Sequence, residues 1–278
     1  ISSIISTSTA PNQLNYLDYL QSAYQDNNRK FIFLFGNNIG DSPSSYIHNY
    51  VINKNSNISY LNYETSELAD IVNIIQQPYF IGASVTMPYK EKIIPYLDKN
   101  SNYDAINTIS KTGNSYLLNN TDTLALQYFN EDLPTYIFGT GGAAIGAIKA
   151  FDSNNITVIG RNKDKLKELS KKYNITTNTF EEFKIINTEH LIVNCLPSNV
   201  CIKRYFNKNT ILIDMTYGIH NYQTKDLVKK YINGYDILYV QAAYQYMEWF
   251  NGTKFNEIIQ DYKRGIDLFL NEKYYLIT

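Results

Sequence analysis

The sequence predicts an α/β fold of two domains: an N-terminal α/β substrate domain and a Rossmann-type, doubly wound dinucleotide-binding domain. Short apolar runs that end at glycine or a polar residue alternate with stretches of helical periodicity, which is the pattern of parallel βαβ units. A hairpin-like segment interrupts this alternation, and a glycine-rich turn then opens a second alternating set. The 278 residues are enough for two domains, each with a core of its own.

The first alternating set begins at residues 31–36, an apolar run ended by Gly36 that is typical of a buried strand. The elements expected after it are a helix at 44–52, a strand at 58–64, a helix at 66–75, a strand at 80–85 and a helix at 90–97. Residues 106–109 and 115–118 then predict the hairpin, with a glycine-containing turn between them.

The second set predicts a further series of βα units. The elements expected are a strand at 135–138, a helix at 141–151, a strand at 156–159, a helix at 164–173 and strands at 190–194 and 211–214. We find no solenoid repeat, so two βα sets follow one another in series.

Composition excludes several classes of function. Charged residues make up 18% of the chain and the formal net charge is −1, which argues against nucleic acid or a membrane surface as the main partner. No run of about 20 apolar residues is present, so no membrane-spanning segment is expected. Cys195 and Cys201 are expected to be reduced, as in the cytoplasm, and no histidine lies at ligand spacing from them, so no metal site is expected.

The turn at residues 139–144 follows a predicted strand and opens a predicted helix, as a dinucleotide-binding turn does. Gly139 permits the tight turn, Gly141 lets the backbone approach a pyrophosphate, and Ala144 is small enough for the helix to pack on the strand. Free N–H groups at the helix N-terminus favour the pyrophosphate. The candidate cofactor-binding residues of this turn are Gly139, Gly141, Gly142 and Ala143. The alternative is a tight strand–helix turn with no ligand.

The next strand ends about twenty residues later, where an NAD enzyme would carry an acid for the ribose 2′-hydroxyl. This chain has Arg161 and Asn162 there, then Lys165, with no acid before Asp164. A guanidinium and an amine suit a 2′-phosphate, so these residues predict NADP as the cofactor. The alternative is that Arg161 is a solvated residue at a helix start.

An ordered set of motifs resembles the shikimate dehydrogenase family over residues 31–278. The motifs are the strand and lysine at 82–90, the segments 105–108 and 120–122, the glycine turn at 139–144 and the terminal motif at 241–252. The resemblance implies an oxidoreductase, an NADP-dependent shikimate dehydrogenase that reversibly reduces 3-dehydroshikimate to shikimate in aromatic amino-acid biosynthesis. Its partners would be the small-molecule substrate and NADP, with no nucleic acid and no membrane.

The resemblance also implies a domain division. The expected parts are an N-terminal extension or linker at 1–29, a substrate-binding domain at 30–121 plus 241–278, and an NADP-binding Rossmann domain at 122–240. Ligands are expected at the carboxyl ends of the strands, in the crevice between the domains. Trp249 is expected to be a core residue on a terminal helix that returns to the first domain.

Two serines are implied as contacts to the substrate carboxylate, at Ser42 and Ser44. Hydroxyls donate hydrogen bonds without adding charge. Ser44 also precedes a helical stretch, so a helix N-cap is the alternative or an additional role. The chain departs from the family at Asp41, where histidine is usual, and at Ser45, where proline is usual; an anionic Asp41 would weaken carboxylate binding unless it points away.

Further contacts come from the same resemblance. Thr86, Asn107 and Gln241 match positions that contact ring hydroxyls, and Tyr217 matches a tyrosine that helps close the site. Asn194 matches a position near the nicotinamide, although the Gly-Met that usually follows is replaced by Asn199 and Val200. Without the family context Asn107 would be a turn residue and Gln241 a surface amide.

Lys90 and Asp122 are the candidate catalytic pair. Reduction of a ketone by hydride generates an alkoxide, which needs a proton donor within hydrogen-bonding reach. A lysine with the ordinary pKa of about 10.4 is an acid at neutral pH, and a neighbouring Asp122 would favour its ammonium form. The alternative is a structural salt bridge with no catalytic role.

Two rival functions remain at this point. One is a quinate/shikimate dehydrogenase, for which an acid in place of Arg161 would have favoured NAD. The other is a non-catalytic, repressor-like sensor of the quinate pathway, which loss of Lys90 or Asp122 would have favoured. Both residues are present, so the sequence favours the dehydrogenase.

Residues 1–29 are expected to lie outside the dehydrogenase core, with a short helix near residues 17–24. Residues 9–14 resemble a loop near the end of type I dehydroquinate dehydratases, with Asn12 in place of glycine. That enzyme directly precedes shikimate dehydrogenase in fungal and protist pathway polypeptides, so the resemblance implies covalent linkage to other shikimate-pathway domains. The absent initiator Met fits a piece of a longer chain, and an unrelated extension is the alternative. Deleting residues 1–25 is then expected to leave stability and activity unchanged.

Overall fold

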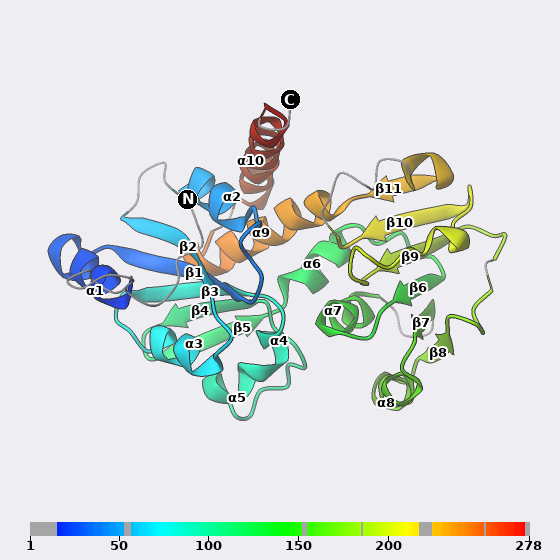
Figure 1. Cartoon of the computed structure of the whole chain (residues 1–278), viewed down its shortest axis with the longest axis horizontal. Coiled ribbons are helices and arrows are strands. Elements are labelled where there is room, and N and C mark those ends of the chain that lie inside the picture. The colour runs from blue at the N-terminus through cyan, green and yellow to red at the C-terminus, as the bar shows by residue number, and fades with distance from the viewer. Residues whose placement is uncertain are drawn as a thin grey trace. The chain divides into compact units, whose positions relative to one another are not determined.

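A computed structural model of the chain describes residues 16–52, 57–151, 155–184, 186–216, 224–252 and 254–275. The chain divides into two compact units (Figure 1): unit 1 is Ile1–Thr121 with Ala242–Thr278, and unit 2 is Asp122–Gln241. The units divide after residues 121 and 241, beside the divisions expected after residues 121 and 240, and they have no division at the expected boundary after residue 29. Both units combine a sheet with helices, which confirms the predicted α/β fold class.

Unit 1 is built on a five-stranded sheet with the strand order β2-β1-β3-β4-β5. Its strands are β1 (Lys30–Gly36), β2 (Ile58–Glu64), β3 (Phe80–Val85), β4 (Thr108–Thr112) and β5 (Ser115–Asn119). The strands β1, β2 and β3 are parallel, whereas β4 pairs antiparallel with both β3 and β5. β4 and β5 are the predicted hairpin, and Gly113 takes a positive φ of 60° in its turn.

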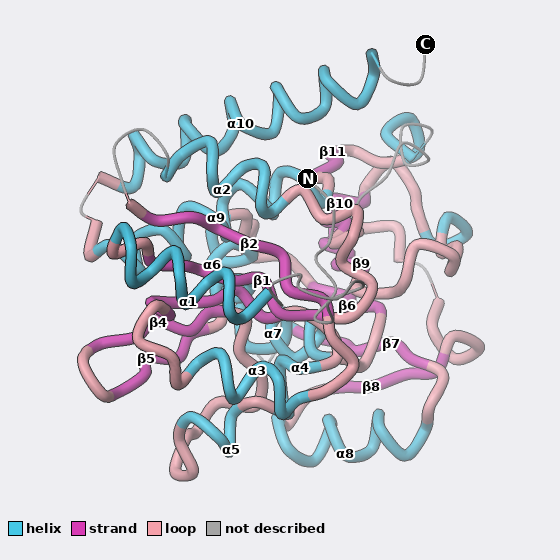
Figure 2. The backbone as a smooth tube through the Cα atoms, turned by 60° about the vertical axis from the view of Figure 1, so that its left-hand side comes forward, coloured by secondary structure: helices cyan, strands magenta, loops and turns pink. Residues whose placement is uncertain are grey.

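Helices cover both faces of this sheet, and Figure 2 shows α2 and α10 on one side of its strands with α3 and α5 on the other. The helices of unit 1 are α1 (Tyr16–Asn27), α2 (Ser44–Ile52), α3 (Leu68–Ile75), α4 (Tyr89–Lys92), α5 (Ile94–Leu97) and α10 (Phe255–Tyr275). The helix α9 (Gly234–Phe250) runs across the boundary at residue 241, and its second half belongs to unit 1. The helix expected at 90–97 is two short helices, because Pro95, in the first turn of the second one, lacks the N–H that would continue the first.

The side chains of β1 alternate between two cores. Phe31, Phe33 and Phe35 belong to a cluster with residues of α1 and α3. Ile32 and Leu34 belong to a second cluster, against which Trp249 and other aromatic residues of α9 pack. A strand buried on both faces explains the continuous apolar run in the sequence. Trp249 is therefore a packing residue of unit 1, as expected.

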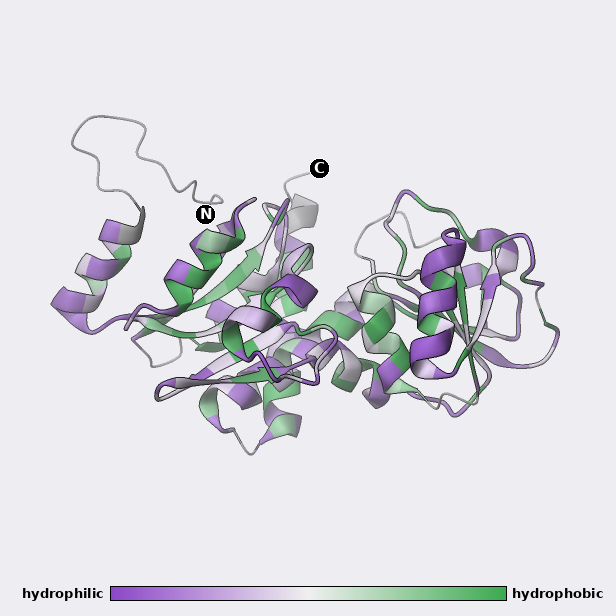
Figure 3. Cartoon of the chain, turned by 90° about the horizontal axis from the view of Figure 1, so that it is seen from below, coloured by the Kyte–Doolittle hydropathy of each residue, from purple (hydrophilic) through white to green (hydrophobic). Residues whose placement is uncertain are grey.

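The helix α1 corrects the expectation for residues 1–29. In Figure 3 this helix, next to the grey N-terminal trace, carries both hydrophilic and hydrophobic residues. Leu20 is 0% exposed and lies in the cluster that contains Phe31, and the rings of Tyr24 and Tyr79 meet edge to face at 6.5 Å. The segment from residue 16 onward thus packs on the sheet of unit 1. The match at residues 9–14 lies outside the described residues.

Unit 2 is built on a six-stranded parallel sheet with the strand order β11-β10-β9-β6-β7-β8. Its strands are β6 (Thr135–Phe138), β7 (Ile156–Gly160), β8 (Thr176–Thr179), β9 (His190–Asn194), β10 (Thr210–Asp214) and β11 (Lys230–Ile232). Counted from β6, this is the 3-2-1-4-5-6 order of the doubly wound dinucleotide-binding fold. Its other elements are α6 (Thr121–Tyr128), α7 (Gly142–Ala150), α8 (Lys163–Tyr173), the 3-10 helix η2 (Lys203–Tyr205) and the first half of α9.

The sequence pattern missed two strands of this sheet, β8 and β11. They are four and three residues long and lie at the two edges of the sheet, where burial is partial. The strand β8 consists of threonines and Asn178, so it has no apolar run to mark it. Edge strands are defined by pairing with a neighbour, which local composition does not reveal.

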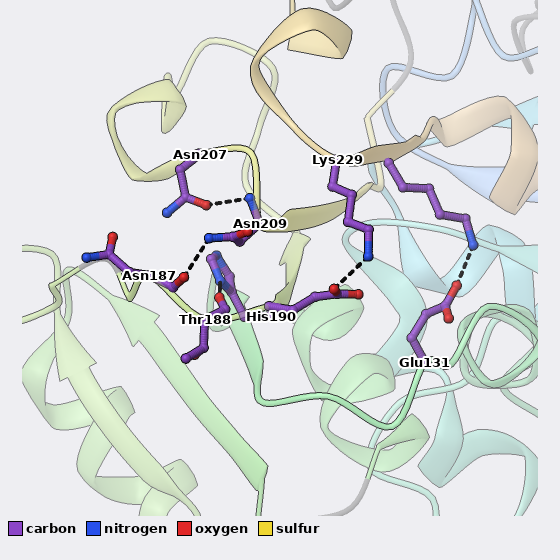
Figure 4. Close-up of polar contacts among 9 residues, drawn as sticks. Glu131, Asn187, Thr188, His190, Asn207, Asn209 and Lys229 are labelled. Carbon is purple, nitrogen blue, oxygen red and sulfur yellow. Dashed lines mark hydrogen bonds and ion pairs between the residues drawn. The ribbon is translucent and has the colours of Figure 1, made fainter.

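The amino edge of the unit 2 sheet is held by polar contacts between strand starts and loops, shown in Figure 4. His190 Nδ1 lies 2.8 Å from the Thr188 carbonyl, and its Nε2 lies 3.0 Å from Thr210 Oγ1. Lys229 Nζ pairs with Glu189 at 2.6 Å. Ligands of such folds bind at the opposite, carboxyl edge, so this cluster is structural.

Candidate functional site

Three connections of unit 1 meet at the carboxyl edge of its sheet. Phe35 near the end of β1 pairs with Val85 at the end of β3, so the loops after these parallel strands leave side by side. Ser84 pairs with Thr108, the first residue of the antiparallel β4, so the segment before β4 reaches the same edge. These connections carry the unit 1 residues expected in the substrate site: Ser42, Ser44, Thr86, Lys90 and Asn107.

The two serines expected at the substrate carboxylate lie together. Ser42 Oγ is 3.1 Å from Ser44 Oγ, and the Ser44 backbone N–H donates to Ser42 Oγ at 3.4 Å. Ser44 is the first residue of α2, so Ser42, not Ser44, supplies the capping oxygen. The start of α2 thus presents adjacent hydroxyls near a helix N-terminus, a favourable place for an anion. Asp41 is exposed to solvent, where its charge is screened.

The loop that carries these serines is held in place by Glu64, which was not among the residues expected in the site. Glu64, at the end of β2, accepts hydrogen bonds from the backbone N–H groups of Asn38 and Ile39 at 3.1 and 3.2 Å. An acid as the last residue of a predicted strand, at the carboxyl edge of the sheet, is the signal that could have identified it. Glu64 therefore sets the path of the chain toward Ser42.

The segment that carries Lys90 is held by its backbone. Thr86 N–H donates to the Phe35 carbonyl at 2.8 Å, and the Ile106 N–H donates to the Lys90 carbonyl at 2.8 Å. Gly36 makes this close approach possible, because a Cβ there would lie 2.4 Å from the Thr86 methyl group. The half-buried Lys90 is thereby placed next to the segment that precedes β4.

Asn107 is fully buried and its side-chain oxygen is saturated. Oδ1 accepts hydrogen bonds from Thr121 N–H at 2.7 Å, from Thr121 Oγ1 at 3.0 Å and from Thr108 Oγ1 at 2.8 Å. These three hydrogen bonds fix the orientation of the Asn107 amide. Asp122, which is buried, follows Thr121 directly and is the first residue of unit 2. The pairing of Lys90 with Asp122 stays a prediction.

The glycine turn of unit 2 lies at the point where the strand order reverses, between β6 and β9. Gly139 has a φ of +127°, and a Cβ there would come within 3.2 Å of Cys195, so this position requires glycine. Gly141 caps α7, and no atom lies within 4 Å of the place where its Cβ would be. Ala144 is completely buried against the sheet. The backbone of this turn therefore leaves open space at a helix N-terminus, as binding of a pyrophosphate requires.

Two of the three polar residues expected at the end of β7 already have hydrogen-bond or ion-pair partners. Asn162 caps α8, with its Oδ1 accepting the Lys165 N–H at 3.0 Å, and Lys165 Nζ pairs with Glu168 at 3.1 Å. Arg161 is exposed, and within the described part of the chain its guanidinium has no ion-pair partner. Arg161 is therefore the cation that could bind a phosphate at this strand end.

Asn194 and Asp214 end the neighbouring strands β9 and β10 and pair with each other. Asn194 Nδ2 donates to Asp214 Oδ1 at 3.1 Å, and Thr216 donates to the same oxygen through its N–H at 3.1 Å and its hydroxyl at 2.8 Å. Burial raises the pKa of the Asp214 carboxyl, and these hydrogen bonds oppose that rise. A cavity of about 200 Å³ lies beside them, lined also by Ser198 and Val200.

Asp214 was not among the expected site residues, although a buried acid at a strand end signals a site. The Asn194 amide is hydrogen-bonded to Asp214, so a cofactor would contact the two residues as a pair. Gln241 lies half-buried on α9 at the end of unit 2. Tyr217 lies outside the described residues.

The described residues contain no group of three or more His, Cys, Asp or Glu side chains that could hold a metal ion. None of the described helices is both long enough and apolar enough to cross a membrane.

The strand orders and the glycine turn define a two-domain α/β protein, one domain of which is of the Rossmann type. A family model for the shikimate dehydrogenase substrate binding domain matches residues 34–109. The chain is 30% identical to the shikimate dehydrogenase (NADP(+)) of Saccharolobus solfataricus, over 84% of this chain and 94% of that protein. The chain therefore belongs to the shikimate dehydrogenase family.

Two further comparisons agree with this membership. The crystal structure of shikimate dehydrogenase from Aquifex aeolicus superposes with a TM-score of 0.74 at 20% identity, covering 87% of this chain and 98% of that one, which shows a shared fold. The pentafunctional AROM polypeptide of Pneumocystis carinii is 31% identical over 79% of this chain. The chain spans 17% of the length of that polypeptide.

Proposed function

We propose that the chain is an NADP-dependent shikimate dehydrogenase that reversibly reduces 3-dehydroshikimate to shikimate in aromatic amino-acid biosynthesis. The proposal rests on the carboxyl edge of the unit 1 sheet, where the connections that carry the expected substrate contacts meet. The family model of the substrate-binding domain covers residues 34–109, which include each unit 1 residue expected in the substrate site. The proposed compartment is the cytoplasm, where Cys195 and Cys201 stay reduced. Linkage to other pathway domains is proposed from the AROM relative.

The proposed binding roles follow the geometry of the two carboxyl edges. Ser42 and Ser44 hold the substrate carboxylate, while Thr86, Asn107, Gln241 and Tyr217 contact the ring hydroxyls. The open backbone at Gly139, Gly141, Gly142 and Ala143 holds the pyrophosphate of NADP, and Arg161 with Asn162 and Lys165 faces its 2′-phosphate. Asn194, in its pair with Asp214, borders the nicotinamide. The three hydrogen bonds to Asn107 Oδ1 support this scheme, because they fix the orientation of an amide that is expected to contact a ring hydroxyl.

The proposed chemistry assigns the proton to Lys90. Bound NADPH supplies the hydride that reduces the ketone. The Lys90 ammonium donates a proton to the oxygen that becomes the alcohol, and it takes the proton back in the reverse direction. Asp122 holds the lysine and a ring hydroxyl. The hydrogen bond from the Ile106 N–H to the Lys90 carbonyl holds the Lys90 backbone beside the Asn107 segment, which supports the assignment.

A direct assay tests the proposal. Purified protein is given shikimate or quinate, each with NADP+ or NAD+, and absorbance at the reduced-nicotinamide band is followed. Shikimate with NADP+ is expected to give the highest kcat/KM of the four pairs. Binding of shikimate without turnover would support a sensor instead, and a preference for quinate with NAD+ would support the other dehydrogenase branch.

Arg161 is expected to set cofactor preference. A hydrogen bond to a charged group contributes about 1.5–3 kcal/mol, so Arg161→Ala should weaken NADP+ binding by roughly ten- to over a hundredfold. NAD+ binding should change little, because NAD+ lacks the 2′-phosphate. Titration of both cofactors measures the ratio. Lys167→Ala, which removes the same charge from an exposed position of α8, is the control; equal losses for NADP+ and NAD+ in the Arg161 variant would contradict the assignment.

Substitution of Gly139 and of Gly141 should affect different properties, namely stability and cofactor affinity. In Gly141→Ala the new methyl group meets no protein atom, so stability should be unchanged while NADP+ affinity falls by at least about tenfold through a clash with the pyrophosphate. In Gly139→Ala the positive φ and the contact with Cys195 should cost about 1–3 kcal/mol of stability or more. Denaturation curves and cofactor titrations separate the two effects. Unchanged cofactor affinity in Gly141→Ala would remove the turn from the cofactor site.

A further inference from the structure

Gln245 lies at the centre of a buried polar network in unit 1. Its side chain is 1% exposed, so each of its polar atoms needs a partner. Oε1 accepts a hydrogen bond from Ser84 Oγ at 3.0 Å. Nε2 donates to the Asn107 carbonyl and to Thr108 Oγ1, both at 3.2 Å. The amide of α9 thus bridges the ends of β3 and β4 at the edge that carries the proposed substrate contacts.

The outer arm of this network, formed by Ser84, His48 and Tyr262, fixes the orientation of the Gln245 amide. His48 is buried, hydrogen-bonds Gln245, and its Nδ1 lies 2.6 Å from the Tyr262 hydroxyl. Burial lowers the pKa of His48 to about 3, so the ring is neutral and carries one N–H. His48 thus links the Tyr262 hydroxyl to the Gln245 side chain. Because its oxygen accepts from Ser84, Gln245 directs its NH₂ group toward Asn107 and Thr108.

The inner arm of the network, which runs from Gln245 through Thr108, holds Asn107 at two points. The Gln245 amide binds the Asn107 main-chain carbonyl directly. It also binds Thr108 Oγ1, which in turn donates to Asn107 Oδ1 at 2.8 Å. Thr121, the residue before Asp122, donates to the same oxygen from its backbone at 2.7 Å. The Thr108 hydroxyl accepts a hydrogen bond from Gln245 and donates the next one to Asn107, so these two bonds strengthen one another.

We infer that Gln245 is a positioning residue of the substrate site, which acts by holding the Asn107 backbone directly and the Asn107 amide through Thr108. This inference rests on the proposed function. Gln245 itself contacts the interior of unit 1, and its effect on the substrate passes through Asn107. Without the Gln245 donor, the Asn107 carbonyl and Thr108 Oγ1 each lose a hydrogen bond, and the Asn107 side chain keeps only its contacts with Thr121 in full. Asn107 would then be held less precisely against a ring hydroxyl.

The test replaces Gln245 with methionine, which keeps the length of the side chain and removes its hydrogen bonds. Steady-state kinetics should show the KM for shikimate rising by about tenfold, with the KM for NADP+ unchanged. The decisive readout is a double-mutant cycle with Asn107→Ala. If Gln245 acts through Asn107, Gln245→Met should have almost no further effect on the shikimate KM once Asn107 is alanine.

A matched control removes a buried hydroxyl contact away from the site. Thr210→Val breaks the contact of Thr210 with His190 at the amino edge of unit 2, and it should lower stability without changing the KM for shikimate. Thr108→Val is the second test variant should Gln245→Met not fold, because it cuts the same inner arm with an isosteric side chain. The same selective rise in the shikimate KM is expected from it.

The outcomes separate the inference from the proposed function. A wild-type chain that neither binds nor oxidises shikimate overturns the proposed function and the inference with it. An active wild type whose Gln245→Met or Thr108→Val variant loses stability at an unchanged shikimate KM overturns the inference alone. Additive effects of Gln245→Met and Asn107→Ala do the same.

Discussion

Replacing Lys90 with alanine is expected to lower the turnover of shikimate by about a hundredfold or more, the scale of a positioned general acid or base. The affinity for NADP+ should stay nearly unchanged, because the glycine turn and Arg161 lie in unit 2. The backbone of Lys90 remains held by its contact with Ile106, so the fold should tolerate the change. Steady-state kinetics and a cofactor titration on the same preparation measure both effects.

The control for this experiment lies two residues away. Lys92 is an exposed lysine of the same short helix α4, so Lys92→Ala removes an equal charge without touching the edge of the sheet. Its kcat should match that of the wild type. A Lys90→Ala variant with a near-normal rate would end the proposed role and leave Lys90 as a structural residue.

Replacing Leu20 with alanine is expected to destabilise the protein by about 2–5 kcal/mol, the usual cost of a large-to-small change in a core. Leu20 is 0% exposed and packs in the cluster that contains Phe31 and Tyr79. Urea denaturation should show a lower midpoint with little change in slope. The KM for shikimate should stay constant, because Leu20 packs in a core cluster and is not among the residues proposed to bind substrate.

The adjacent residue supplies the matched control. Tyr19 is 56% exposed on the same helix, so Tyr19→Ala should change the free energy of unfolding by less than about 0.5 kcal/mol. If the two variants were equally stable, α1 would contribute nothing to unit 1, and the expectation of an extension outside the core would stand. The deletion of residues 1–25, which the sequence reading expects to be harmless, should instead be as damaging as Leu20→Ala or more so.

The features predicted correctly from the sequence are those encoded by neighbours along the chain. The apolar run from Phe31 to Phe35 marks a strand wherever it packs, because both of its faces are buried. The turn at Gly139 and Gly141 is recognisable because a positive φ and an open helix start need glycine at those positions. Lys90, Asn107 and Asp122 could be assembled into one candidate site because their motifs follow a known order in the family.

Other features depend on partners distant in the sequence, and no local pattern contains them. The helix α1 looks polar by composition, and its role comes from Leu20 meeting a core built by residues of β1 and α3. The strands β8 and β11 are too short and too polar to be recognised before they pair with a neighbour. Asp214 acquires its raised pKa from burial beside Asn194, twenty residues away.

The clearest case is Gln245. In the sequence it is one more amide on an aromatic-rich helix, four residues after Gln241, which matched the family motif. Its burial against Ser84 and Asn107 arises when α9 packs across the ends of β3 and β4. Local sequence therefore specifies the strands, the turns and the order of the motifs, since these depend on backbone preferences and periodicity. Which polar groups are buried, and so must be paired and oriented, depends on long-range packing, and that is where the arrangement of Asn107 is set.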